Sequence, residues 1–124
     1  MDWPEKIQWI EKAATEIIPS LSKELPTLAT NYAEAEAEYD KALGLVTARL
    51  EGGESFMVDD VEIKHTSVTT LPAKAKTVCW KERFKLIQAV KLHQAQIHRL
   101  SATQSALTGM QSVLKFHGGE NAGI

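Results

Sequence analysis

The four histidines are the residues best suited to hold a metal ion: His65, His93, His98 and His117. His93 and His98 are five residues apart, so on a helix they do not share a face, whereas metal ligands must converge on one point. No H-E-x-x-H arrangement places a carboxylate beside them. The sequence therefore predicts no metal site and no cofactor.

The single cysteine, Cys79, precedes Trp80 and lies near Lys81, a setting that could favour a thiolate nucleophile. No Cys-His pattern accompanies it, so a buried structural cysteine is the favoured interpretation. The chain has no P-loop, no G-x-G-x-x-G and no G-x-S-x-G. Four acids are scattered around a predicted helix rather than along one face: Glu34, Glu36, Glu38 and Asp40. We expect no catalytic residues and no enzyme.

Charge is distributed unevenly along the 124 residues, although the net charge is only −2. Residues 1–71 contain six Lys/Arg and fourteen Asp/Glu, whereas residues 72–117 contain eight Lys/Arg and one acid, Glu82. Such opposite segments are expected to attract one another, and the basic one could also meet an acidic partner. Five basic residues are predicted to face outward and to bind a partner or nucleic acid: Lys74, Lys81, Lys85, Lys91 and Arg99.

Two interpretations of this basic strip remain open. It could contact phosphates, with an affinity that falls steeply with salt, or it could be a solvated face that keeps the helix soluble. No RNP, zinc-finger or GxxG-type signature supports nucleic-acid binding, and a pI of about 6.1 weighs against it.

The first predicted helix covers residues 4–18, where apolar residues recur at helical spacing. Asp2 and Glu5 form a capping box before it. Pro19 is predicted to stop it, and residues 20–25 are predicted to form a bent connector or a short helical turn.

The second predicted helix covers residues 26–51, begins at Pro26 and ends at Gly52-Gly53. The run YAEAEAEYDKAL is rich in strong helix formers, which favours a helix over a strand. A heptad supplies its apolar stripe: Leu25, Tyr32, Tyr39 and Val46 at a, with Leu28, Ala35 and Ala42 at d.

Residues 52–71 form an insert with β-branched and aromatic residues and few helix formers. A β-hairpin that pairs 55–58 with 61–65 and turns at Asp59-Asp60 is one prediction. This turn lacks the Gly that two-residue hairpin loops favour, so an irregular excursion is the alternative.

A third helix is predicted as one rod over residues 72–116, followed by a disordered tail over 118–124. Lys76 and Arg83 fall at a positions, so its first turns fit the heptad less well. The later turns carry a regular seam that we predict for self-association: Val90, His93, Ile97, Leu100, Gln104, Leu107, Gln111 and Leu114.

These elements predict a mainly all-α fold, in which one domain over residues 1–117 forms a long antiparallel helical hairpin with an N-terminal helix. Three helices would cover the rod thinly, so we expect a homo-oligomer, with a dimer favoured. No apolar run is long enough to span a bilayer and no signal peptide is evident, so we expect a cytoplasmic protein without a membrane partner.

The stretches YAEAEAEYDKALGLVTARL and ERFKLIQAVKLHQAQIHRLSATQSALTGMQSVLKF together resemble the small helical-hairpin proteins encoded by many bacteriophages. Those proteins have an Ala/Glu/Tyr-rich first helix, a variable middle and a second helix ending in a phrase similar to LTGMQSVLKF. The resemblance covers residues 31–116, whereas the N-terminal helix and the 51–71 insert have no clear counterpart in it. It implies a phage or prophage accessory protein in a bacterial host cell, concerned with DNA replication and recombination or with host takeover.

From the residues and this resemblance we expect a non-enzymatic protein-binding module that self-associates. It would engage, and in one version inhibit, a host macromolecular complex such as a defence factor. The alternative is a DNA-binding replication or recombination accessory protein that uses the basic outer face of the third helix.

Overall fold

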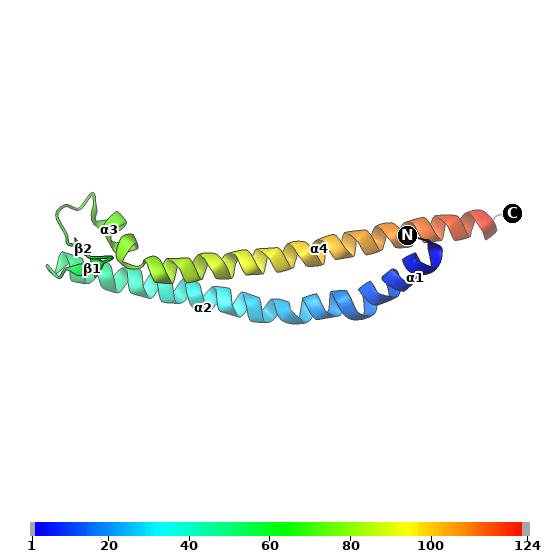
Figure 1. Ribbon diagram of the computed structural model, residues 1–124, viewed down its shortest axis with the longest axis horizontal. Coiled ribbons are helices and arrows are strands. Elements are labelled where there is room, and N and C mark those ends of the chain that lie inside the picture. Colours follow the sequence, from blue (N-terminus) through cyan, green and yellow to red (C-terminus); the bar gives the residue numbers. More distant parts are fainter. Residues whose placement is uncertain (1, 123–124) are drawn as a thin grey trace. The chain divides into compact units, whose positions relative to one another are not determined.

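The computed structural model describes residues 2–122, with side chains to residue 116. Its elements are α1 (Trp3–Lys12), the π-helical turn η1 (Ala13–Ile17), α2 (Ile18–Glu51), β1 (Phe56–Val58), β2 (Val61–Ile63), α3 (Leu71–Val78) and α4 (Trp80–Ala122) (Figure 1). The predicted mainly all-α fold with a small β-hairpin between the long helices is confirmed.

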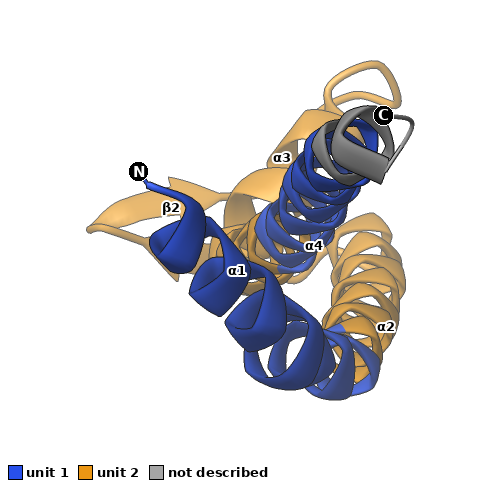
Figure 2. Cartoon of the chain, turned by 90° about the vertical axis from the view of Figure 1, so that its right-hand side faces the viewer, with its two compact units in different colours: residues 1–28, 93–124 blue, residues 29–92 orange. Residues whose placement is uncertain are grey.

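Two compact units make up the chain, and each contains part of both long helices (Figure 2). Unit 1 comprises residues 1–28 and 93–124, and unit 2 comprises residues 29–92. Within each unit, the parts of α2 and α4 run in opposite directions.

The N-terminus of α1 has the capping box expected from the sequence. The Glu5 backbone N–H donates to Asp2 Oδ1 at 2.9 Å, and the Asp2 N–H donates to Glu5 Oε2 at 3.3 Å. The helix then widens into η1, at whose end the Ile18 N–H donates to the Ala13 carbonyl five residues back.

The prolines do not break the helix, so the predicted stop at Pro19 is wrong, and residues 20–25 are a helical part of α2 rather than a bent connector. Pro19 is the second residue of α2 and lies two residues after the end of η1, whose wider turn gives its ring room against the preceding carbonyls. Pro26 lies inside α2 with its ring exposed to solvent. Packing of the apolar face of α2 outweighs the cost of this proline.

The predicted heptad describes the inward face of α2, because all its a and d residues are at least half-buried. Leu50 is fully buried and forms a small core with Leu71 and Ala75 of α3, on which Phe56 of β1 also packs. The helix ends as predicted: Gly53 has φ +91°, and its N–H donates to the Leu50 carbonyl at 3.0 Å.

The insert contains the predicted hairpin, and its turn lies where we expected it. Phe56 pairs with Ile63 and Val58 with Val61 in an antiparallel ladder. Asp59 and Asp60 adopt φ values of 47° and 64°, which a type I′ turn requires at both central positions. Asp tolerates this left-handed conformation better than most residues, so the turn forms without glycine.

The predicted single rod over 72–116 is wrong at one point: α3 ends at Val78, and α4 begins at Trp80 after the capping residue Cys79. A straight helix would place Lys76 and Arg83 in its apolar seam. The break lets Leu71 and Ala75 pack on Leu50 while both cations remain in solvent.

The inward face of α4 also differs from the predicted a/d seam. The residues at the d positions are half-buried as expected: His93, Leu100, Leu107 and Leu114. At the a positions, however, Ile97, Gln104 and Gln111 are exposed. The g residues Gln96 and Thr103 turn inward instead, and Gln96 is only 5% exposed. The helix continues to Ala122, and the last two residues of the predicted tail lie outside the described residues.

Gln96 turns inward because it finds hydrogen-bond acceptors on α2 within unit 1. Its Nε2 donates to the Leu21 carbonyl at 3.2 Å and to Glu24 Oε2 at 3.1 Å. A buried amide is stable only when it is hydrogen-bonded, so these contacts select g over a as the inward position.

Candidate functional site

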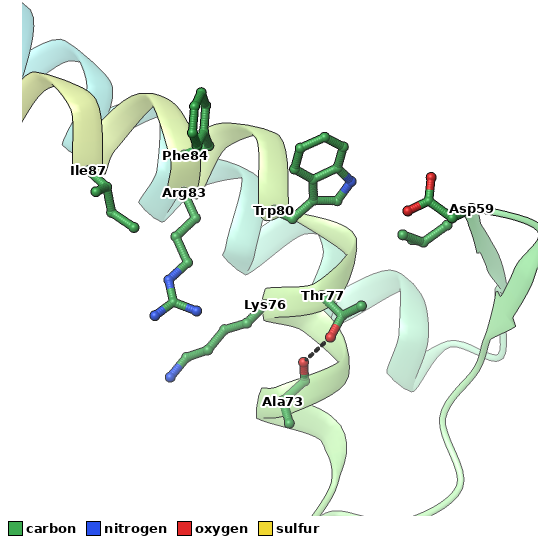
Figure 3. A pocket seen from close by; sticks show the side chains of 9 residues that line it. Asp59, Ala73, Lys76, Thr77, Trp80, Arg83, Phe84 and Ile87 are labelled. Carbon is green, nitrogen blue, oxygen red and sulfur yellow. Dashed lines mark hydrogen bonds between the residues drawn. The ribbon is translucent and has the colours of Figure 1, made fainter.

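An open groove of about 660 Å³ lies in unit 2, where α3, α4 and the turn of the hairpin meet (Figure 3). The break between α3 and α4 creates it, because the two helices present different faces to the same space. Its lining comes from three elements: Val58 and Asp59 of the hairpin, Ala73, Lys76 and Thr77 of α3, and Trp80, Arg83, Phe84 and Ile87 of α4.

Three large apolar side chains of α4 lie along this groove. Trp80, Phe84 and Ile87 are 46%, 55% and 43% exposed. Their spacing of four and then three residues places them on one side of the helix over two turns. Exposed apolar side chains that cluster along a groove make this surface a candidate interaction site.

Two cations border the apolar stripe. Lys76 on α3 and Arg83 on α4 extend toward the same side of the groove in Figure 3. Both are exposed, and neither forms an ion pair with any carboxylate that the structure describes. Asp59 lies beyond Trp80 on the hairpin side. The groove is therefore electrically asymmetric, with its positive border at Lys76 and Arg83.

Local contacts hold the walls of the groove in place. The Lys74 ammonium donates to the Lys64 carbonyl at 2.8 Å and to Thr66 Oγ1 at 2.6 Å, so α3 is tied to the segment that follows β2. Thr77 Oγ1 donates to the Ala73 carbonyl at 2.9 Å. This hydroxyl is occupied within its own helix and is not poised as a nucleophile.

Cys79, at the break itself, is 1% exposed. Burial, reinforced by the nearby Glu82 carboxylate, raises the pKa of the thiol, so the neutral form is favoured. The interpretation of Cys79 as a buried structural residue fits this environment better than the thiolate nucleophile.

None of the five predicted basic residues lines the groove. Lys74 is held by the contacts above, and the Lys81 ammonium lies 5.7 Å from the centroid of the Trp80 ring, within cation–π range. Lys85 and Lys91 are exposed on α4 in unit 2, and Arg99 is exposed in unit 1.

Sequence reasoning missed Lys76, Arg83, Trp80, Phe84 and Ile87 as site residues. One signal was present in the sequence, because Lys76 and Arg83 occupy a positions and interrupt the heptad. Such an interruption indicates that a different face of the helix is buried on either side of it. The hairpin wall of the groove had no comparable signal, because its approach to α4 depends on tertiary packing.

Some of the residues predicted for self-association are half-buried, and the others are exposed. Val90, together with every d residue of the set, is half-buried against the chain itself. The remaining a residues present an exposed row on α4: Ile97, Gln104 and Gln111. Val113 and Phe116 are also exposed, at 53% and 73%.

The candidate metal ligands do not form a cluster among the described residues. Among the described residues, no group of three or more His, Cys, Asp or Glu could hold a metal ion. Nδ1 of His65 is buried with no hydrogen-bond partner in the part of the chain that the structure describes. The side chain of His117 lies outside it. No described helix has the length and apolar character needed to cross a bilayer.

No protein-family model, curated protein or solved structure matches this chain.

Proposed function

We propose that the chain is a non-enzymatic module that binds a protein partner through the groove between α3, α4 and the hairpin. The exposed stripe of Trp80, Phe84 and Ile87 carries this proposal. Trp and Phe are enriched in the cores of protein interfaces, and Trp is among the residues that carry most of the binding energy. Leaving three of them in water has no benefit for folding, so a partner that covers them accounts for their presence.

The chemistry of the groove supports binding rather than catalysis. Its one carboxylate, Asp59, has no histidine or second acid beside it among the lining residues, and the Thr77 hydroxyl is bonded within α3. General acid–base work needs paired titratable groups within hydrogen-bond reach of a substrate.

The resemblance to phage-encoded helical proteins supplies the setting of the proposal. The module acts in the cytoplasm of a bacterial host cell, and its partner is a component of a host macromolecular complex such as a defence factor, which it inhibits. This part rests on the resemblance alone.

Self-association is a second part of the proposal. The exposed apolar residues on the C-terminal part of α4, Ile97, Val113 and Phe116, are available for a dimer contact. Light scattering at micromolar concentration is expected to report twice the mass of the 13.7 kDa chain. A monomeric mass removes this part and leaves the groove proposal standing.

Co-purification of the tagged chain from its native cell tests the proposed function. Wild-type chain is expected to capture a defined protein, and Trp80→Ala combined with Phe84→Ala is expected to lose it. Leu92→Ala is the matched control, because Leu92 is 60% exposed on α4 but does not line the groove.

The DNA-binding alternative predicts a different result in the same preparation. An electrophoretic shift at two salt concentrations would show tight, salt-sensitive binding that Lys81→Glu with Lys85→Glu abolishes. That outcome, together with no captured protein, would overturn the proposal.

A further inference from the structure

We infer that the groove takes an acidic amphipathic helix of the partner, with its apolar face on Trp80, Phe84 and Ile87 and its carboxylates at Lys76 and Arg83. This inference rests on the proposed function and specifies the chemistry of the partner segment.

The length and spacing of the apolar stripe favour a helix as occupant. From Trp80 to Ile87 the stripe covers eight residues, and the seven steps between them span roughly 10 Å at 1.5 Å per residue. A partner helix offers apolar side chains at i, i+4 and i+7, which match this length over two turns. An extended strand would have to pair along a sheet edge, whereas seven of the nine residues that line the groove belong to helices and only Val58 and Asp59 come from the hairpin.

Lys76 and Arg83 favour a partner segment with negative charge. Lys76 and Arg83 have no carboxylate partner within the described chain, so they are available to acids that flank the apolar face of the incoming helix. Arg can bind a carboxylate through two parallel N–H donors, which adds geometric specificity. A basic helix would meet like charges at this border, and like charges oppose association.

Asp59 favours one orientation of the partner helix in the groove. It lies on the hairpin side of Trp80, opposite the border formed by the cations (Figure 3). A carboxylate placed there would be repelled, so the acids of the partner segment are expected on its Lys76 side only. One neutral or basic edge and one acidic edge therefore define the partner helix.

Three labelled helical peptides of one length provide the test, each titrated with the full chain by fluorescence anisotropy. The first has Leu at i, i+4 and i+7 with Glu along one edge, the second has Lys in place of Glu, and the third has Ser in place of Leu. The acidic amphipathic peptide alone is expected to give saturable binding.

Charge reversal at the groove is the decisive variant. Lys76→Glu with Arg83→Glu is expected to weaken binding of the acidic peptide by about tenfold, since two exposed attractive pairs become repulsive. The same variant should improve binding of the Lys peptide. Lys85→Glu with Lys91→Glu, which changes net charge equally outside the groove, should preserve the preference for the acidic peptide, and circular dichroism checks that both variants fold.

Several outcomes would overturn the inference. Equal binding of the Glu and Lys peptides, or no binding of the acidic peptide at millimolar concentration, removes the acidic helix as occupant. A labelled oligothymidylate that binds and is lost on Lys76→Glu with Arg83→Glu assigns the groove to nucleic acid instead. A dimer of the wild-type chain that dissociates with the same variant assigns it to a second copy.

The experiments distinguish a failure of the acidic-helix inference from a failure of the proposed function. If the peptides do not bind but the native partner is still captured and lost with Trp80→Ala and Phe84→Ala, the acidic-helix inference is wrong and the proposed function stands. If the native cell also yields no groove-dependent partner, both are wrong.

Discussion

Replacing Pro26 by Ala is expected to stabilise the protein. Pro26 lies within α2, has no N–H to donate to the Ser22 carbonyl, and has its ring in solvent, so the replacement loses no packing. A proline in a helix interior is about 3 kcal/mol less favourable than Ala. Against this, the unfolded chain gains conformational freedom that costs up to about 1 kcal/mol. The net expectation is a gain of about 2 kcal/mol.

Urea unfolding followed by circular dichroism at 222 nm measures this gain as a higher midpoint at unchanged slope. For a chain of 124 residues, 2 kcal/mol corresponds to a rise in Tm of about 8 °C. Pro4→Ala is the matched control, because Pro4 lies in the first turn of α1, where its missing N–H has no helical acceptor. No gain for Pro26→Ala, or a loss, would refute the continuous α2 and favour a chain break near residue 26.

Three other experiments test separate parts of the structure. Leu50→Ala should cost about 2–5 kcal/mol by opening the core of unit 2, whereas Leu45→Ala, at a residue 49% exposed, should cost less than about 1 kcal/mol in the same urea titration. Asp60→Gly should stabilise the hairpin by about 1 kcal/mol, since glycine removes the cost of φ 64°; a loss would mean that the turn is not type I′. Because burial and Glu82 raise the pKa of Cys79, the native chain keeps the thiol proton to higher pH than the unfolded chain. Stability should therefore fall as pH rises past the pKa of an unfolded cysteine, and a disulfide reagent at pH 8 should react slowly until urea is added; immediate reaction in native buffer would contradict the buried thiol.

Local rules predicted much of the fold. The heptad on α2 identified its inward face, and the Asp59-Asp60 turn fixed the register of the hairpin. Asp2 and Glu5 marked the start of α1, and Gly53 marked the end of α2. Each of these features depends on residues close together in the chain, so a single sequence contains the necessary information.

The errors came from positions where distant packing overrides a local preference. Pro19 and Pro26 are strong helix breakers by themselves, yet the wider turn of η1 accommodates Pro19 and the apolar face of α2 keeps the helix continuous through Pro26. At Cys79 the reverse happens: no Gly or Pro marks the break, and the packing of Leu71 and Ala75 on Leu50 produces it.

The candidate site was predictable only as a region. The basic first part of the third predicted helix was the place to look, but the residues chosen there by outward heptad position do not line the groove. Arg83 and Trp80 became visible as neighbours of Lys76 and Asp59 only once the break at Cys79 and the hairpin were in place.

Site-specific photo-crosslinking in the native cell shows whether a protein partner occupies the groove. A benzophenone amino acid is placed at Thr77, which lines the groove, or at Leu92, which is exposed on α4 outside it. One discrete protein adduct is expected from position 77, and none of that mass from position 92. Adducts of equal yield from both positions, or crosslinks from position 77 only to nucleic acid, would overturn the proposed role of the groove.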